Sequence, residues 1–292
     1  MKRRSLVFFG LLALSLLAVV PSASAQLLAA KDGPVVYGHH HLNVTNIEEQ
    51  KKFFANALGG TAMKIGTNNI EIVKFPNVLI FLRAQAPTGG SKGTTANHIG
   101  FSVPNIRAAV DKIKANGYPM ITKSEAPAGR EIKDDVAAPA QPGGASIAFA
   151  MGPDEVKVEL VEAKEQTAPI QLHHIHFFST QNMQMREWYA KTFGAKLRAP
   201  NPAAAFVTAD LPGVALNFTP SPDPVVGTQG RSVDHVGFEV KNLEAFARKL
   251  EADGIKLERP YTKVAALDIS ILYIKDPWGT YIELTDGLDR VR

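Results

Sequence analysis

The chain contains no cysteine among its 292 residues. This absence excludes disulfide bonds, thiolate metal sites and lipid attachment through cysteine. An excess of charge is also lacking: the formal charge is +4, and Lys2, Arg3 and Arg4 supply three of those charges, so the remainder is near +1. A balance of this kind provides no electrostatic footprint for nucleic acid, and we expect no nucleic-acid partner.

A run long enough to span a membrane is missing as well. Residues 6–20 form an apolar run that is too short for a comfortable span. The run follows the three basic residues and precedes Pro21 and a small-x-small triplet at 23–25, which is the pattern of a secretory signal peptide. We therefore predict a signal peptide over residues 1–25, a mature N-terminus at Gln26, a periplasmic or secreted protein, and no stable membrane insertion after cleavage. An uncleaved anchor helix is the alternative.

The chain does contain a short strand pattern that recurs four times and carries a histidine at its third position each time. The four copies read YGHHHLNV (37–44), ANHIGFSV (96–103), LHHIHFFS (172–179) and VDHVGFEV (233–240). All eight histidines of the chain lie in these strands: His39, His40, His41, His98, His173, His174, His176 and His235. Random scatter would not produce this distribution, so the histidines have a role that is tied to the repeat.

Each histidine strand begins a unit in which a helix and further strands follow. Gly59 and Gly194 both lie 20 residues after the aligned histidines of their units, His39 and His174, whereas Gly117 and Gly254 lie 19 residues after His98 and His235. The units therefore alternate A-B-A-B, which indicates a duplicated domain. We predict two domains, at residues 33–165 and 169–288. Residues 123–145 are rich in Pro, Gly, Ala and charge, and are either a lid over a site or a disordered insertion.

The last strand of each B unit carries a glutamate among apolar residues. Glu159 and Glu283 each lie six residues after a proline. A carboxylate in an otherwise apolar strand is costly to bury unless it is paired or bound to a metal. Two histidines and one glutamate per domain suit a divalent metal that keeps open positions for water and substrate. A histidine that is a satisfied core residue is the ordinary interpretation of one such strand, but not of four aligned ones.

Paired βαβββ units that begin with a histidine strand and end in D-P-x-G-x-x-x-E resemble the vicinal oxygen chelate superfamily. Here the motif is Asp276-Pro277-Trp278-Gly279 before Glu283, together with WYAKTFG at 188–194, and the resemblance covers residues 35–286. That superfamily includes glyoxalase I, extradiol dioxygenases, fosfomycin-resistance transferases and bleomycin-binding proteins. The resemblance implies an α+β fold with two tandem domains, each a cup-shaped half-barrel of paired βαβββ modules that holds one metal.

Carried over residue by residue, the resemblance implies two sets of metal ligands. These would be His39, His98 and Glu159 in the first domain, and His174, His235 and Glu283 in the second. The metal would be zinc, manganese, nickel or iron. An oxidising compartment without thiolates favours the first three over ferrous iron.

Departures from the family patterns reduce the number of reaction types that we expect. Glyoxalase I would require a second acidic ligand, but Phe81 and Asn217 hold that position. Tyr273 lies ten residues before Glu283, as in the extradiol dioxygenases, but residues 264–266 lack their catalytic histidine. We therefore expect a metal-dependent lyase, isomerase or transferase that acts on a small substrate through vicinal oxygens. A non-catalytic small-molecule binder like the bleomycin-resistance proteins is the alternative, and an extradiol dioxygenase is less favoured.

Two further histidines are candidates for proton transfer. His41 and His176 lie two residues past their ligands on the same strand face, about 6.6 Å further along, which would place them beyond the coordination sphere but within reach of substrate. Each is therefore a candidate general base, with Tyr273 as a hydrogen-bond donor. A packing role is equally compatible with their position. His40 and His173 face the other way, and we assign them no role.

Overall fold

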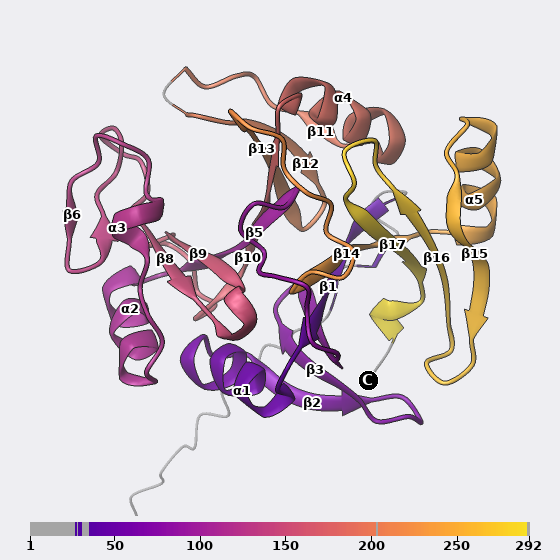
Figure 1. Cartoon of the computed structure of the whole chain (residues 1–292), viewed down its shortest axis with the longest axis horizontal. Helices are drawn as coiled ribbons and strands as arrows, with labels where there is room; N and C mark the ends of the chain where they lie inside the picture. The colour runs from indigo at the N-terminus through magenta and orange to yellow at the C-terminus, as the bar shows by residue number, and fades with distance from the viewer. Residues whose placement is uncertain (1–26, 28, 31–34, 203, 291–292) are drawn as a thin grey trace, which may run out of the picture.

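The computed structural model describes residues 27, 29–30, 35–202 and 204–290. The predicted signal peptide at residues 1–25 lies outside these residues. The described chain forms four modules, each of which begins with a histidine strand (Figure 1). No helix among the described residues is long and apolar enough to cross a membrane.

Sheet 1 has eight strands in the order β15-β16-β17-β14-β1-β4-β3-β2. Module 1 contributes β1 (Val35–Val44), β2 (Thr61–Ile65), β3 (Ile70–Phe75) and β4 (Val78–Ala84). Module 4 contributes β14 (Val233–Val240), β15 (Leu257–Val264), β16 (Ile269–Lys275) and β17 (Tyr281–Asp286).

Sheet 2 has nine strands in the order β11-β12-β13-β10-β5-β9-β8-β7-β6. Module 2 contributes β5 (Ala96–Val103), β6 (Ile132–Lys133), β7 (Val136–Ala137), β8 (Ile147–Met151) and β9 (Lys157–Glu162). Module 3 contributes β10 (Gln171–Ser179), β11 (Lys196–Leu197), β12 (Val207–Leu211) and β13 (Val214–Pro220).

The histidine strands pair at the centre of each sheet. β1 runs antiparallel to β14 in sheet 1, and β10 runs antiparallel to β5 in sheet 2. Each sheet therefore joins one module from residues 33–165 with one module from residues 169–288. Neither sheet is formed by the two modules of a single predicted domain. The α+β class and the two cup-forming sheets of paired modules are as predicted.

Each module places one main helix against its sheet. These helices are α1 (Ile47–Lys51), which continues as the π-helix η2 (Lys52–Ala57), α2 (Ile106–Ala115), α4 (Asn182–Phe193) and α5 (Leu243–Ala252). Asn46, Asn105 and Asn242 cap three of them, because each amide oxygen accepts a backbone N–H of the first turn. Short helical segments lie at α3 (Thr122–Glu125), η3 (Pro153–Glu155) and η4 (Leu288–Arg290).

One hydrophobic core takes residues from both sheets and from the helices. It includes Phe54, Phe101, Tyr189 and Phe238, all of which are fully buried. Because apolar residues alternate along each strand, the histidines that the repeat aligns occupy the opposite, concave face of each sheet. The DPWG motif supports this core, since Tyr189 of α4 donates a hydrogen bond of 3.1 Å to Asp276 before β17.

Residues 123–145 are largely irregular, as their composition indicated, but they also include short regular elements. They contain most of α3 together with β6 and β7, and they extend sheet 2 at its edge. Ile121, Ala126 and Ile132 pack against a cluster that contains Phe149 on β8. The segment therefore covers part of the concave face of sheet 2.

Candidate metal centres

Site 1 lies at the centre of sheet 1. His39 on β1 and His235 on β14 each place Nε2 2.9 Å from Oε2 of Glu283 on β17. All three residues are buried, and one ligand atom from each lies within 4.8 Å of the others. These residues come from modules 1 and 4, whose histidine strands pair at the centre of the sheet.

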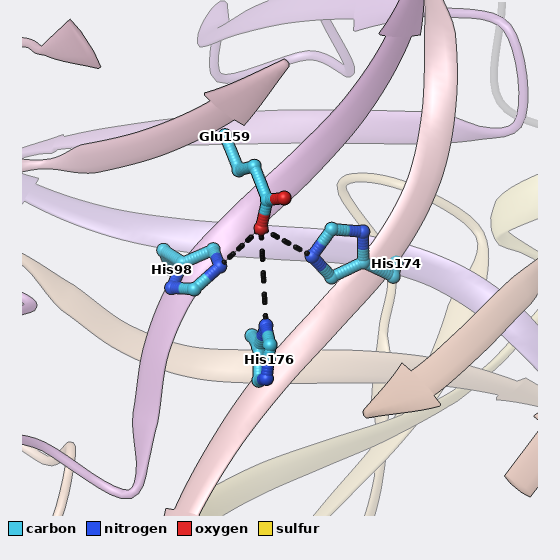
Figure 2. Close-up of side chains that lie close together, drawn as sticks. All are labelled: His98, Glu159, His174 and His176. Atoms are coloured by element: carbon cyan, nitrogen blue, oxygen red, sulfur yellow. Dashed lines mark hydrogen bonds and ion pairs between the residues drawn. The ribbon is translucent and has the colours of Figure 1, made fainter. Parts of the chain in front are cut away.

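Site 2 repeats this arrangement in sheet 2 and adds a fourth residue. Oε2 of Glu159 lies 2.8 Å from His98 Nε2, 3.2 Å from His174 Nε2 and 3.8 Å from His176 Nδ1 (Figure 2). The four ligand atoms all lie within 4.8 Å of one another. The expected grouping of His98 with His39, and of His174 with His235, is therefore wrong, because the sheets join modules 1 and 4, and modules 2 and 3.

A glycine makes room for one imidazole in each site. In the strand register His39 lies opposite Gly237, and His174 lies opposite Gly100. A Cβ atom at Gly237 would lie 2.0 Å from the His39 ring, and a Cβ atom at Gly100 would lie 2.1 Å from the His174 ring. The histidine two residues before each glycine, His235 or His98, can therefore share a glutamate with the opposing histidine.

The donor sets fit a divalent metal. Within the two sites, three buried imidazole nitrogens have no hydrogen-bond partner among the described residues: Nδ1 of His39, Nε2 of His174 and Nδ1 of His176. Both ring nitrogens of His40, on the other face, also lack one. Buried polar atoms without partners are uncommon, and in site 2 two of them converge on a carboxylate. Imidazole nitrogen and carboxylate oxygen are ligands that zinc and other divalent metals accept.

The charge of each glutamate depends on its histidines. Burial would raise the pKa of Glu283, but His39 and His235 outweigh it and hold that pKa well below 4.5. Burial is likewise outweighed at Glu159, where His174, His176 and His98 lower the carboxyl pKa well below 4.5. Both glutamates are therefore ionised and available as ligands.

The two equivalent histidines, His235 and His98, have different partners at Nδ1. His235 Nδ1 lies 2.7 Å from Oδ1 of Asp234, and His98 Nδ1 lies 2.9 Å from Oδ1 of Asn97. Although burial lowers the pKa of His235, Asp234 and Glu283 outweigh it and raise that pKa above 6.5. Burial lowers the pKa of His98 well below 6.5, and the Glu159 hydrogen bond does not reverse this shift.

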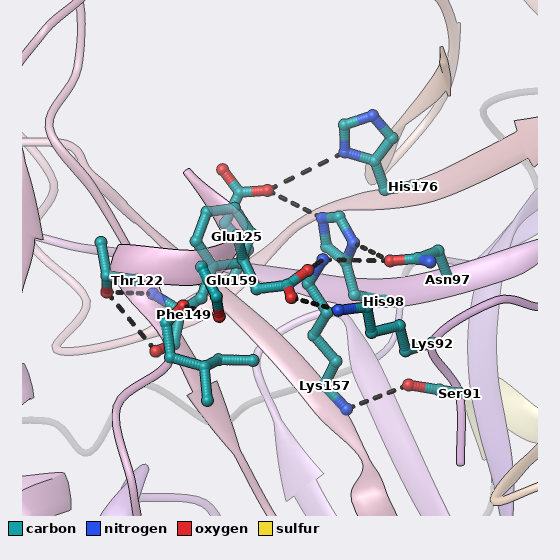
Figure 3. A network of polar contacts seen from close by, with 12 residues as sticks. Ser91, Lys92, Asn97, His98, Thr122, Glu125, Phe149, Lys157, Glu159 and His176 are labelled. Atoms are coloured by element: carbon teal, nitrogen blue, oxygen red, sulfur yellow. Dashed lines mark hydrogen bonds and ion pairs between the residues drawn. The ribbon is translucent and has the colours of Figure 1, made fainter. Parts of the chain in front are cut away.

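A chain of polar contacts connects Asn97 to the covering segment of sheet 2 (Figure 3). Lys157 Nζ donates to Asn97 at 3.1 Å and to Glu125 on α3 at 2.7 Å. Lys157 is almost completely buried, so this ion pair has little solvent around it. Site 2 is thus physically linked to residues 122–125, whereas Asp234 in site 1 accepts from Asn43 at 3.0 Å and from the Gly230 N–H at 2.7 Å.

The candidate proton-transfer residues occupy different positions. His41 stacks on Phe81, with ring centroids 5.6 Å apart, and its ring centroid lies 4.6 Å from that of His235. It stands outside the site 1 ligand group. His176 belongs to the site 2 ligand group, so the expectation that it lies beyond the coordination sphere is wrong there. The Cα spacing along a strand does not fix the ligand-atom spacing, because the His174 and His176 side chains converge on Glu159.

Tyr273 lies beside site 1. It pairs with Glu283 across β16 and β17, and its ring centroid lies 5.3 Å from that of His235. Burial, and then the Glu283 charge, raise the pKa of Tyr273 far above 10, so its phenol stays protonated. A cavity of about 230 Å³ opens here and is lined by Arg83, Gln85, Gln229, Gly230, Asp234, His235, Arg259, Tyr273 and Tyr281.

Several residues of the sites were not predicted. Asp234 and Asn97 directly precede the aligned histidines of the two B units, and this position in the sequence was an available signal. His173, to which we assigned no role, lies in a strand irregularity and places Nδ1 2.9 Å from His174 Nδ1. For Arg83 and Arg259, the sequence contained no indication of a role at the site beyond their charge. His40 is fully buried on the other face, as expected.

A family model matches the second half of the chain. Residues 171–284 match the Glyoxalase/Bleomycin resistance protein/Dioxygenase superfamily. This match confirms the resemblance that the histidine strands and the DPWG motif indicated, and it places residues 171–284 in that superfamily. No curated protein sequence matches at a significant level.

Solved structures share the fold at low identity. Glyoxalase I from Zea mays is 17% identical with a TM-score of 0.66, and the alignment covers 88% of this chain and 94% of that one. A putative dioxygenase from Bacillus subtilis is 13% identical with a TM-score of 0.61, over 86% of this chain and 84% of that one. These identities establish the fold, while the reaction must be argued from the sites.

Proposed function

We propose that this member of the glyoxalase, bleomycin resistance and dioxygenase superfamily is an exported metal-dependent enzyme whose reaction takes place at site 1. Its substrate would be a small molecule that presents two neighbouring oxygens, and the reaction would be of the lyase, isomerase or transferase kind. The observation that carries the proposal is the cavity of about 230 Å³ that meets His235 and Tyr273 directly beside a set of three ligands. Three protein ligands leave coordination positions open, as catalytic sites require.

His39, His235 and Glu283 would hold the metal, which when bound would supply Lewis-acid polarisation of the two substrate oxygens. The residues of the chain then have separate tasks. Asp234 fixes the orientation of His235 through its 2.7 Å contact. Phe81 supports His41 by stacking, and Tyr273 supplies a phenol donor at the cavity wall.

His41 is the residue proposed to take the proton. Burial, and next the proximity of His235, lower its pKa well below 6.5, so its imidazole is neutral at pH 7. Its side chain makes no hydrogen bond to any other described residue, which leaves a lone pair free to accept a proton. A neutral imidazole whose ring centroid lies 4.6 Å from that of His235, a residue of the cavity wall, is suited to general-base catalysis. Tyr273, which stays protonated, is suited to donate to a developing oxyanion.

A screen of the metal-loaded protein tests this proposal. It should be offered α-hydroxythioesters, catechols and epoxides, and turnover should require metal and disappear in His235→Ala. The matched variant His98→Ala removes the equivalent histidine of site 2, and we expect it to retain turnover. Turnover that survives in His235→Ala but is lost in His98→Ala would transfer the reaction to site 2.

A non-catalytic binder is the second candidate. It is favoured by one observation: Phe81 and Asn217 stand where a fourth carboxylate would complete a glyoxalase set. A binder should show a large thermal shift with a compound that it returns chemically unchanged, and that shift should persist in His235→Ala. The ring-cleaving dioxygenase is less favoured, because residues 264–266 carry no histidine and Val264 packs in an apolar cluster.

Export is part of the proposal and has its own test. Mass spectrometry of the mature protein should identify Gln26 as the first residue. Recovery of the protein with an intact Met1 from a soluble cytoplasmic fraction would contradict export.

A further inference from the structure

We propose that the substrate of site 1 carries an anionic group, a carboxylate or a phosphate, which Arg83 and Arg259 hold at the mouth of the cavity. This inference rests on the proposed function, because it names the class of molecule that the cavity beside site 1 accepts. Both arginines line that cavity together with His235 and Tyr273.

Arg83 is held in place by one edge of its guanidinium group. Its Nε donates to Asn43 Oδ1 at 2.9 Å, and Nη2 lies 3.7 Å from Asp234 Oδ2. Its terminal nitrogens make no hydrogen bond to any described residue, and the side chain is nearly half exposed. A fork that is anchored at Nε and open at its end is pre-organised for an oxyanion.

Arg259 is the less engaged of the two. Its side chain makes no hydrogen bond or salt bridge to any other described residue, and its guanidinium carbon lies 5.8 Å from the centroid of the Tyr273 ring. Stacking on an aromatic ring orients the guanidinium while its donors stay available. Arg259 pairs with Tyr273 in the register of β15 and β16, so its backbone position at the cavity wall is fixed.

The carboxylates around the cavity form one long contact with these two arginines, 3.7 Å between Asp234 Oδ2 and Arg83 Nη2. The hydrogen bonds of Asp234 go to His235, Asn43 and the Gly230 N–H. Glu258, next to Arg259, lies 3.4 Å from Lys256 and 3.7 Å from Lys275. Glu283 is committed to the two histidines of site 1. The unused donors at the cavity mouth therefore belong to Arg83 and Arg259.

The corresponding place in sheet 2 lacks the arginine on the central strand pair. Arg83 lies opposite Asn43 on β1, and the residue at the same position in sheet 2 is Thr219, which lies opposite Phe178 on β10. Thr219 Oγ1 lies 2.7 Å from His176 Nε2 and is used within site 2. Arg83 is thus a property of site 1 and not of the duplicated fold.

Two pairs of chelating probes test the inference by titration of the metal-loaded protein. Each pair shares its vicinal oxygens and differs by one anion: catechol with protocatechuate, and dihydroxyacetone with dihydroxyacetone phosphate. In one pair at least, we expect the anionic member to bind about tenfold more tightly than the neutral one. A preference within the catechol pair would indicate a carboxylate on the substrate, and a preference within the dihydroxyacetone pair would indicate a phosphate.

The variant Arg259→Gln should abolish that preference while the metal content stays at the wild-type level. Arg83→Gln should reduce it as well. The control Arg248→Gln makes the same charge change at an exposed position on α5 and should keep the preference. Equal binding within both pairs, or a preference that persists in Arg259→Gln, overturns the anion inference and leaves the proposed function standing. Failure of all four probes to bind overturns both.

Discussion

Sites 1 and 2 share one arrangement of histidines around a glutamate, but the residues that surround this arrangement differ between them. Site 1 has three ligands, an aspartate behind His235 and a cavity at its mouth. Site 2 has four ligands, an asparagine behind His98 and a covering segment tied in through Lys157 and Glu125. Four protein ligands are typical of structural metal sites, and three with an open position are typical of catalytic ones.

The covers of the two concave faces differ as well. In sheet 1 Leu27 and Leu288, from near the two ends of the described chain, pack in the cluster with Phe81 and Ile271. In sheet 2 the inserted residues 121–145 pack on Phe149 and Val161. The two sheets therefore share the histidine–glutamate arrangement, while different segments pack beside it in each sheet.

The largest effect should follow from removal of the two glutamates one at a time. Glu283→Ala should abolish turnover and remove one metal per chain, because its carboxylate joins both histidines of site 1. Glu159→Ala should also remove one metal, retain turnover, and destabilise the fold by about 3 kcal/mol, since three buried imidazoles lose their common partner. Elemental analysis, turnover assays and thermal melts measure all three outcomes. Equal loss of turnover in both variants would show that the sites do not divide their roles.

The next effect separates the two histidines that follow the ligands. His41→Ala should lower turnover by about 10²–10⁴-fold with both metals retained, because the residue lies outside the ligand group and acts as a base. His176→Ala should weaken metal retention at site 2 and leave turnover near the wild-type rate. Metal content after dialysis against a chelator, measured beside turnover, distinguishes the two. Loss of metal from site 1 in His41→Ala would make His41 a ligand instead of a base.

The contrast between His41 and His176 also shows how far the sequence leads. The repeat and strand alternation singled out the histidines and the two glutamates, and the family resemblance supplied the six expected ligands, which the structure brings into two groups. They did not predict which modules pair, since all four histidine strands carry the same pattern and any two could lie side by side. The convergence of His176 on Glu159 depends on side-chain directions that a spacing along the strand does not specify.

The covering segments were equally beyond prediction from composition. Residues 123–145 have the composition of a loop, yet Ile121, Ala126 and Ile132 are spaced irregularly along the chain and still meet on one cluster. The burial of Leu27 was also unforeseen, because nothing in the sequence around residue 27 indicates which strands it would contact. Tertiary packing decided both, and local periodicity contains no information about it.

An exchange of the residues behind the ligands should have an intermediate effect. Asp234→Asn gives site 1 the residue of site 2, and Asn97→Asp does the reverse. The first change should weaken the metal affinity of site 1 by about 10–100-fold, as is usual when a partner of a ligating histidine is altered. The second should strengthen the ion-pair network around Lys157 and leave site 1 unaffected. Competition with a metal-sensitive dye measures both affinities. An unchanged affinity in Asp234→Asn would show that Asp234 does not support metal binding at site 1.

The smallest effect on the reaction should come from the covers. Leu27 is 6% exposed and packs in the cluster that contains Phe81, which in turn stacks on His41. Leu27→Ala should therefore destabilise the protein by about 2 kcal/mol and loosen the support of His41, with a change in turnover of less than about tenfold and both metals retained. Ile132→Ala, a matched truncation in the cover of sheet 2, should leave turnover unchanged. Thermal melts and steady-state kinetics of both variants provide the test. A Leu27→Ala protein with wild-type stability would show that the segment contributes nothing to the concave face, and equal kinetic effects of the two truncations would remove the difference between the covers.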